Sequence, residues 1–312
     1  MKINRAALQK LLPFLSLIGL FIFLSIASPH FLTALNLASV ARQTAVINIM
    51  ALGMTLIIVS GGIDLSVGSI MAFAGVAGTM ALADGYPLWA GILAAVVAGS
   101  LWGLFNGVAT TWLKIPPFIV TLGTLGIARG VTLIVSNGLP VVGLPKDLAF
   151  LGEGSIGGVP FVLVVLIVCA VIVHVVLDST KLGRYTYAIG SNKDAAVYAG
   201  IPVSFYTVAV YTISGMLCGL AAMIEASRLM TGQPTAGQGY ELQVIAAVVI
   251  GGGSLTGGEG SVIGTLIGAF IMGLLANGSD LLGINPYLQQ AIIGGIIILA
   301  VALDNARKRR FA

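Results

Sequence analysis

The sequence predicts an all-α integral membrane protein with about ten membrane-spanning helices in two halves of opposite orientation. Three observations lead to this fold class: a charge-poor composition, ten long apolar runs, and short motifs that occur twice in the same order. Of the 312 residues, 58% are hydrophobic and 8% are charged, and the mean hydropathy is +1.06. A soluble protein carries roughly 25% charged residues, so lipid must surround most of this chain.

Ten apolar runs approach the length of about 20 residues that a helix needs to cross a bilayer. The first run is longer than the core of a signal peptide, and we interpret it as a retained span. The eighth run is short, so a re-entrant path over residues 242–260 is the alternative to a full crossing there. Separators such as "SPH", "DGYP", "KIPP" and "INP" contain helix breakers. The runs lie near residues 11–28, 43–60, 66–83, 88–112, 117–136, 160–177, 204–228, 242–256, 260–278 and 286–303.

The distribution of lysine and arginine predicts the orientation, because these residues are retained on the cytoplasmic side. With the N-terminus in the cytoplasm and ten spans, eleven of the 15 basic residues lie inside. An odd number of spans would place the basic tail outside, so an even number is favoured. The inside residues are Lys2, Arg5, Lys10, Lys114, Lys181, Arg184, Lys193, Arg307, Lys308, Arg309 and Arg310.

Three short motifs occur twice, in the same order, along the chain. "GIDLSV" at 62–67 matches "GYELQV" at 239–244, "GLFNG" at 103–107 matches "GLLANG" at 273–278, and "IPPF" at 115–118 matches "INPY" at 284–287. They predict two pseudo-repeats, about residues 11–136 and 160–303, within one membrane domain of residues 1–312. Each half has an odd number of spans, so the second must be inverted, an arrangement common among transporters.

Asp64 attracts attention because its carboxylate separates two apolar runs in a chain with only 11 acidic residues. An ionisable residue within a membrane suggests a proton or ion site. Its glycine and serine neighbours instead favour a helix cap at a flexible junction near water, which moves when a path opens. Because the motifs repeat, Glu241 is predicted to be a helix cap at the corresponding junction of the second half. The predicted gate or hinge residues are Gly61, Gly62, Asp64, Ser66, Gly239, Glu241, Gly251, Gly252 and Gly253.

Four other polar residues lie inside apolar runs. An arginine at the membrane centre costs about 2.5–3.5 kcal/mol on insertion scales, so Arg129 is either a partnered structural residue near the outer end of its span or part of a pathway. Asparagines in such runs are expected to hydrogen-bond between helices, and some to face a path. The candidate pathway residues are Asn48, Asn106, Arg129 and Asn277. The spacing of the cysteines and histidines predicts no metal site.

The longest predicted cytoplasmic loop, residues 178–204, is longer than a connection requires. Within it, Ser191 or Asn192 can cap a short helix that Gly200 and Pro202 end. A short helix that projects from a membrane domain is suited to docking a soluble partner. We therefore predict a docking segment of Ser191, Asn192, Lys193, Asp194, Ala195, Ala196, Val197, Tyr198, Ala199 and Gly200. The sequence lacks the G-x-x-x-x-G-K-[ST] phosphate-binding motif, so any ATP that drives transport must bind another chain.

In this order, the motifs resemble the permease subunits of ribose-type sugar ABC importers, the second class of bacterial carbohydrate-uptake transporters. The resemblance runs from about residue 57 to 301. The matching stretches are "SGGIDLSVG", "GLFNG", "PPFIVTLGTLGIARG", "GRYTYAIGSNKDAAVYAGI", "GGGSLTGGEGSVIGTLIGA" and "INPYLQQAIIGGIIILAV".

The resemblance implies a membrane domain similar to that of cobalamin importers, with ten spans in a subunit that usually pairs with itself. It implies two further partners: a cytoplasmic ATPase with two fused nucleotide-binding modules, and a periplasmic or extracellular sugar-binding protein. The permease itself would be a non-catalytic subunit of the bacterial inner membrane with both termini in the cytoplasm. It would hold no cofactor, because ATP and magnesium bind the ATPase, to which residues 191–200 would couple it.

Two other classes of protein compete with this interpretation. A secondary transporter with inverted repeats would need charged residues deep in its spans and no docking helix. An intramembrane enzyme would need a nucleophile–base pair or a metal cluster, and the sequence has neither H-E-x-x-H nor paired acids at helical spacing. Nucleic-acid binding is disfavoured because the only basic run is "RKRR" at 307–310.

Overall fold

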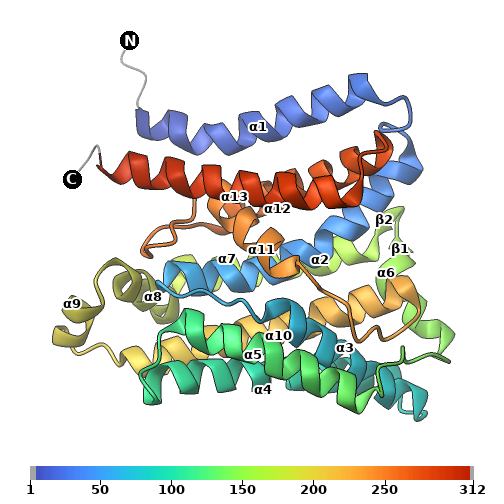
Figure 1. The fold of residues 1–312 in the computed structure, drawn as a ribbon, viewed down its shortest axis with the longest axis horizontal. Helices are drawn as coiled ribbons and strands as arrows, with labels where there is room; N and C mark the ends of the chain where they lie inside the picture. The colour runs from blue at the N-terminus through green and yellow to red at the C-terminus, as the bar shows by residue number, and fades with distance from the viewer. Residues whose placement is uncertain (1–4, 310–312) are drawn as a thin grey trace.

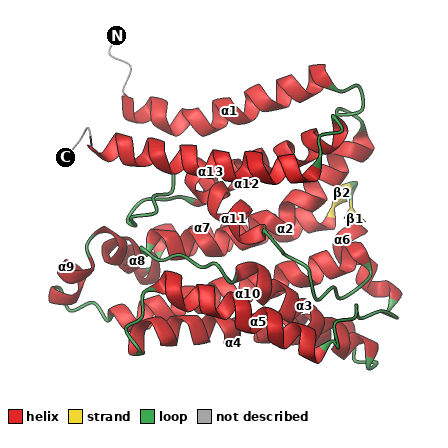
Figure 2. Ribbon diagram, viewed as in Figure 1, coloured by secondary structure: helices red, strands yellow, loops and turns green. Residues whose placement is uncertain are grey.

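A computed structural model of the protein describes residues 5–309, so Lys2 and Arg310 of the basic pattern lie outside the described residues. The described chain is almost entirely helical (Figure 2). Its long helices are α1 (Arg5–Ala27), α2 (Ala34–Val59), α3 (Val67–Ala83), α4 (Leu88–Trp112), α5 (Pro117–Val135), α7 (Phe161–Ser179), α10 (Val203–Leu229), α11 (Tyr240–Ile250), α12 (Val262–Leu281) and α13 (Pro286–Arg309). The short elements are η1 (Lys146–Leu148), α6 (Ala149–Glu153), β1 (Ser155–Ile156), β2 (Val159–Pro160), α8 (Lys181–Ser191) and α9 (Lys193–Tyr198).

A helix occupies each of the ten predicted apolar runs. In the part of the chain that the structure describes, six helices are both long and apolar enough to cross a membrane: α2, α4, α5, α7, α10 and α12. Two others are shorter, α3 with 17 residues and α11 with 11. The chain is therefore a multi-pass, all-helical membrane protein.

Helix breakers mark the ends of the helices, as their sequence positions suggested. Pro87 and Pro160 precede the first residues of α4 and α7, and α5 opens on Pro117, because proline has a fixed φ and its missing N–H is not needed there. The Thr33 hydroxyl accepts a hydrogen bond from the Asn36 N–H at 3.3 Å at the start of α2. The Ser261 hydroxyl accepts one from the Gly264 N–H at 3.1 Å at the start of α12.

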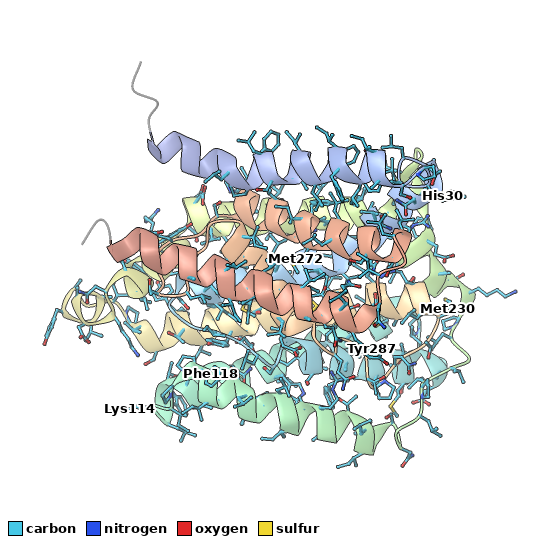
Figure 3. The ribbon with its side chains drawn as sticks, turned by 45° about the horizontal axis from the view of Figure 1, so that its top comes forward. His30, Lys114, Phe118, Met230, Met272 and Tyr287 are labelled. Carbon is cyan, nitrogen blue, oxygen red and sulfur yellow. The ribbon has the colours of Figure 1, made fainter. Side chains whose placement is uncertain are left out.

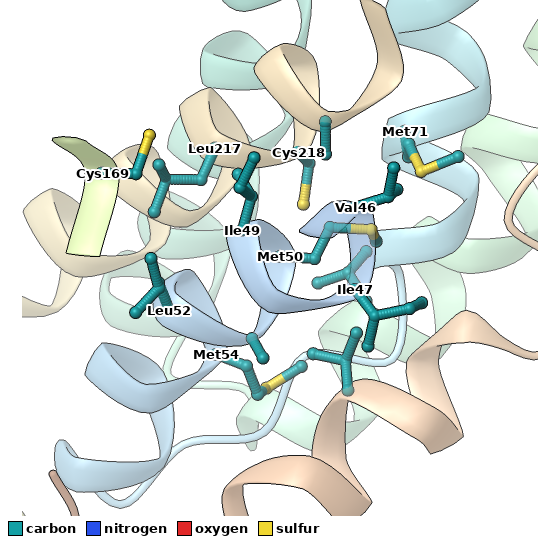
Figure 4. Packing of buried hydrophobic residues seen from close by; sticks show 14 of the residues in the cluster. Val46, Ile47, Ile49, Met50, Leu52, Met54, Met71, Cys169, Leu217 and Cys218 are labelled. Atoms are coloured by element: carbon teal, nitrogen blue, oxygen red, sulfur yellow. The ribbon is translucent and has the colours of Figure 1, made fainter. Parts of the chain in front are cut away.

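The core surrounds α2, which is buried on all sides over residues 44–59. Figure 4 shows Val46, Ile49 and Met50 of this helix packing beside Met71 of α3 and Cys218 of α10. Free cysteines behave as small apolar side chains in such surroundings. Because lipid is as apolar as these side chains, close packing contributes more to helix association here than the hydrophobic effect does.

Helices α4 and α10 approach each other through glycines. A Cβ atom on Gly99 would lie 2.2 Å from the Gly215 carbonyl oxygen, and one on Gly103 would lie 2.2 Å from the Tyr211 carbonyl oxygen. Gly99, Gly103 and Gly107 follow the small-xxx-small spacing that lets two membrane helices touch backbone to backbone. These glycines therefore set the distance between α4 and α10.

Helices α3 and α11 are short, and a non-helical segment precedes each of them. Segment 60–66 leads from the end of α2 to α3, and segment 230–239 leads from the end of α10 to α11. The eighth predicted run, 242–256, was wrong at its end: α11 stops at Ile250, because Gly251–253 begin a loop in which Gly252 has a φ of +92°.

The two non-helical segments enter from opposite ends of the molecule. Segment 60–66 starts where the Gly258 N–H donates to the Val59 carbonyl at 2.9 Å. Segment 230–239 starts at the other end, where Gly232 pairs with Val141 in an isolated β-bridge. The first turn of α3 meets the chain before α11 inside the protein, and a Cβ atom on Gly68 would lie 2.1 Å from the Gly237 carbonyl oxygen.

The helices pack in corresponding pairs. Helix α3 packs against α4 and α5, and α11 packs against α12 and α13. Helix α10 contacts α3 and α4, and α2 contacts α11 and α12. Exchanging the two series of helices thus reproduces these contacts, whereas α1 and α7 have no such correspondence among their main contacts.

The bundle has two distinct ends (Figure 1). One end carries α8, α9 and loop 251–261, and the first turn of α1 and the last turn of α13 lie there too. The opposite end carries α6 and the β1–β2 hairpin, in which Ser155 pairs with Pro160 and Ile156 with Val159. Figure 3 shows Lys114 near the first end and His30 and Met230 near the second.

Substituting Gly103 by alanine tests the close contact between α4 and α10. The new Cβ would overlap the Tyr211 carbonyl, and overpacking of this kind costs about 1–3 kcal/mol. We expect Gly103→Ala to lower the thermal unfolding temperature of the detergent-solubilised protein. Gly19→Ala in α1 is the matched control, since no heavy atom lies within 4 Å of its Cβ position. Equal unfolding temperatures for the two variants would contradict this packing.

Candidate functional site

A buried polar network joins the start of α3 to α4 and α5. The Asp64 carboxylate oxygen Oδ1 accepts hydrogen bonds from the Ser66 N–H at 2.7 Å and from the Ser66 hydroxyl at 2.5 Å. The Asn106 amide of α4 donates to the Ser66 hydroxyl at 2.9 Å and accepts from the Thr124 hydroxyl of α5 at 2.6 Å. Since every member is buried, the satisfied network makes this junction specific in its geometry.

The expected position of Asp64 near water was wrong, because the residue is 1% exposed. Segment 60–66 carries it from the end of α2 into the packed interior, where only protein groups can hydrogen-bond it. Its role as a cap also differs from the prediction: it accepts from the N–H of Ser66, the residue before α3, and Ser66 itself makes no side-chain capping bond. Asp64 thus closes the turn ahead of the helix, as Asp commonly does two residues before its donor.

The rest of segment 60–66 is also held by hydrogen bonds and close contacts. The Ile63 carbonyl accepts hydrogen bonds from the Tyr211 hydroxyl at 3.2 Å and the Thr121 hydroxyl at 3.3 Å. Gly61 has a φ of +82°, and a Cβ on Gly62 would lie 2.6 Å from the Tyr211 hydroxyl. The two glycines predicted as hinges therefore allow a sharp turn and a close approach in this state.

Arg129 holds the other non-helical segment, 230–239. Its guanidinium donates to the Pro234 carbonyl at 2.6 Å and to the Ala236 carbonyl at 2.9 Å. The Glu241 carboxylate, in the first turn of α11, is close enough to attract Arg129. It also lies 2.9 Å from the Cβ position of Gly68 in the first turn of α3. A carboxylate at two helix N-termini is electrostatically favourable, and Arg129 is a partnered arginine.

The remaining asparagines lie away from this junction. Asn277 of α12 and Asn36 of α2 exchange amide hydrogen bonds of 2.8 and 3.1 Å, which is an interhelical contact of the expected kind. Asn48 differs from the expectation, because its amide donates to the Thr44 carbonyl of its own helix at 3.0 Å. Its Oδ1 atom has no hydrogen-bond partner among the described residues.

The predicted docking segment is a helix, but the loop around it is more structured than its sequence suggested. The Asn192 side chain accepts from the Ala195 N–H at 2.9 Å and starts α9, and Gly200 follows with a φ of +77°. Tyr198 is 91% exposed and Val197 54% exposed on this helix. A second helix, α8, fills residues 181–191, so Ser191 ends α8 and does not belong to α9. The Thr180 cap and the amphipathic stretch "KLGRYTYAIGS" were signals of α8.

The predicted hinge at Gly251–253 follows α11 and is closely packed. A Cβ on Gly251 would lie 2.2 Å from the Gly264 carbonyl oxygen, so α11 and α12 meet there backbone to backbone. Gly239 has a φ of +80° at the other end of α11. Sequence reasoning missed Thr121, Thr124 and Tyr211, because single hydroxyls in apolar runs are common and carry no motif.

The described residues include no group of three or more His, Cys, Asp or Glu side chains that could hold a metal ion. The polar network itself joins segment 60–66 to α4 and α5 inside the protein.

Comparison with known proteins gives consistent matches over nearly the whole chain. The family model described as "Branched-chain amino acid transport system / permease component" matches residues 36–301. The chain is 43% identical over 302 residues to the ribose import permease protein of Bacillus subtilis (strain 168), covering 96% of this chain and 94% of that protein. It is 41% identical over 300 residues to the ribose import permease protein of Escherichia coli (strain K12), covering 94% of each.

A relative named for a different sugar also matches. The chain is 38% identical over 284 residues to the D-allose transport system permease protein of Escherichia coli (strain K12), covering 91% of this chain and 87% of that protein. No solved structure matches.

Two substitutions at position 64 separate the hydrogen-bonding role of Asp64 from its charge. Asp64→Asn keeps an Oδ1 that can accept from Ser66, so we expect the unfolding temperature in detergent to change little. Asp64→Ala leaves the Ser66 N–H and hydroxyl without that partner, at a cost of about 2 kcal/mol, and should lower the temperature clearly. An Asn variant as unstable as the Ala variant would show that the charge itself holds the turn.

Proposed function

We propose that this chain, which belongs to the family of branched-chain amino acid transport system permease components, is the membrane subunit of an ATP-driven importer of ribose or a related monosaccharide. The observation that carries the proposal is the match to ribose and allose import permeases over almost their full lengths. Such permeases are non-catalytic, and ATP hydrolysis takes place on a separate partner. The family therefore implies two partners, an ATPase and a substrate-binding protein.

Helix α9 is the proposed contact with the ATPase. It projects from the end of the bundle that also carries α8 (Figure 1), and the apolar side chains of Val197 and Tyr198 are exposed there. Ala196 instead packs into a small cluster with Ile189 and Val203, which fixes α9 on the bundle. An anchored helix that exposes a large aromatic ring is suited to docking a soluble protein. ATP and magnesium would bind that protein, and this chain would hold no cofactor.

We further propose that the chain crosses the membrane about ten times, in two inverted repeats, about 11–136 and 160–303, with a fold similar to that of cobalamin importers. The short helices α3 and α11 would cross together with the non-helical segments that precede them. The corresponding helix contacts in the two series support this proposal. So do the two non-helical segments, which enter from opposite ends and lead to the short helices α3 and α11. Discontinuous helices near the middle of the membrane are typical of transporters with inverted repeats.

A second copy of the chain is the proposed membrane partner, and the face formed by α5 and α13 is the proposed contact. Gly123, Gly126 and Gly130 of α5, and Gly294 and Gly295 of α13, have no heavy atom within 4 Å of their Cβ positions. Both helices lie toward the viewer in Figure 1. Small residues on a lipid-facing surface allow close approach of another helix.

The proposed orientation places α8, α9 and both termini in the cytoplasm and the β1–β2 hairpin outside the bacterial inner membrane. Lys181, Arg184 and Lys193 lie at the α9 end and support this orientation. Loaded binding protein would dock on outer loops, including residues 137–160 and 229–241. Closure of the ATPase would then move α9, and rigid-body movement of the halves would open a path at the interface of the two copies.

A secondary transporter remains the second candidate, and two observations disfavour it. Asp64 and Arg129 are occupied by hydrogen bonds that hold non-helical segments, whereas a coupled-ion site needs groups that are free to exchange an ion. The exposed helix α9 would also have no purpose in a transporter that works without an ATPase.

The proposal is tested with proteoliposomes that contain the permease, its ATPase and the loaded binding protein. We expect ribose uptake that requires ATP. Tyr198→Ala should abolish co-purification of the ATPase and reduce uptake at least tenfold, because its ring is the most exposed aromatic group on α9. Tyr287→Ala is the control for co-purification, since Tyr287 is 81% exposed at the opposite end of the bundle. Uptake that persists without ATP would contradict the proposal.

A further inference from the structure

Helix α8 connects α9 to the interior of the bundle without an intervening flexible loop. Asn192 is at once the residue after α8 and the residue before α9, and its side chain caps α9. Ile189 of α8 packs with Ala196 of α9 and Val203 of α10. The Tyr185 ring of α8 contacts the Tyr206 ring at 4.9 Å. Because α8 and α9 share a cap and an apolar cluster, a displacement of α9 must move α8 as well.

The last turn of α8 touches backbone of both halves at one point. A Cβ atom on Gly190 would lie 1.8 Å from the Val59 carbonyl oxygen and 2.6 Å from the Gly258 nitrogen. Another on Gly257 would lie 2.6 Å from the Gly190 carbonyl oxygen and 2.8 Å from the Gly61 Cα. We call Val59, Gly61, Gly190, Gly257 and Gly258 the Gly190 joint.

Two hydrogen bonds close the Gly190 joint. The Gly258 N–H donates to the Val59 carbonyl at 2.9 Å, which ties loop 251–261 to the end of α2. The Tyr187 hydroxyl of α8 donates to the Gly260 carbonyl at 2.7 Å, which ties the same loop to α8. Contacts between backbones leave no flexible side chain to absorb movement, and packed protein is nearly incompressible.

The Gly190 joint contacts the non-helical segments next to both short helices, α3 and α11. Val59 and Gly61 stand at the start of segment 60–66, which leads to α3, and Gly257 and Gly258 lie in the loop that follows α11. Figure 1 shows that loop reaching the end of the bundle that carries α8. A displacement of α8 would therefore act at the same time on the start of segment 60–66 and on the loop that follows α11.

We propose that Gly190 is a positioning residue that transmits movement of the ATPase-bound helix α9 directly to segment 60–66 and to the loop after α11. This inference rests on the proposed function and adds to it the route by which ATP hydrolysis reaches the membrane helices. Such a route acts through a contiguous, tightly packed contact rather than through distance alone.

The experiment measures ribose transported per ATP hydrolysed in proteoliposomes that contain the complete transporter. Gly190→Ala inserts a Cβ where Val59 and Gly258 leave no room, and it leaves the exposed face of α9 unchanged. We expect the ATPase to co-purify and to hydrolyse ATP, while the transport ratio falls roughly tenfold or more, within the usual range of coupling between sites. A transport ratio equal to that of the wild type would overturn the inference.

A milder pair of variants tests the same contact of α8 even if Gly190→Ala does not assemble. Tyr187→Phe removes the hydrogen bond to Gly260 and keeps the ring, so the transport ratio should fall by roughly 2- to 10-fold. Tyr185→Phe makes the same chemical change in the same helix and should keep the wild-type ratio, because its ring contact with Tyr206 remains. A variant that is only less stable would give a lower yield of complex but the same amount of ribose transported per ATP hydrolysed. An unchanged ratio for Tyr187→Phe would overturn the inference.

The same assay separates failure of this inference from failure of the proposed function. If wild-type transporter takes up ribose without ATP, the proposed function fails and the inference fails with it. If wild-type uptake requires ATP and the variants at Gly190 and Tyr187 keep the wild-type ratio, only the inference fails.

Discussion

The architecture depends on one contact, the approach of the first turn of α3 to the chain before α11 at Gly68 and Gly237. A segment inside a membrane must satisfy its own backbone hydrogen-bonding groups, and extended backbone is tolerated only where protein surrounds it. The two non-helical segments meet this condition through hydrogen bonds from Thr121, Tyr211 and Arg129 to their carbonyls. The polar side chains of the interior are therefore best understood as supports for irregular backbone.

The glycine contacts and the buried polar network have complementary effects on the helix packing. Where glycines replace side chains, as between Gly99 and Gly215, helices touch backbone to backbone, and such contacts transmit displacement with little loss. The hydrogen bonds among Asp64, Ser66 and Asn106 then specify one arrangement of segment 60–66 against α4. A transporter needs both properties, because rigid bodies must move between defined states.

Composition and motif order predicted the all-helical membrane fold, the family resemblance and a short helix within residues 191–200, which the structure places at Lys193–Tyr198, since these depend on local signals. The depth of Asp64 was not predictable, because an extended segment that enters a bundle has no hydrophobic period. The partners of Asn48 and Arg129 depend on which helices adjoin them, and nearly uniform apolar runs do not reveal that. Helix α8 had readable signals in its Thr180 cap and amphipathic pattern, but they lay inside a stretch interpreted as a loop.

In the proposed inverted arrangement of the two halves, α9 and the start of α13 lie on opposite sides of the membrane. Its most direct test is labelling of single cysteines at positions 198 and 287 in intact cells with a membrane-impermeant thiol reagent; Cys169 and Cys218 are buried and contribute little background. The inverted arrangement predicts that Tyr287→Cys is labelled from outside and Tyr198→Cys only after the cells are opened. Labelling of both from the same side would contradict it.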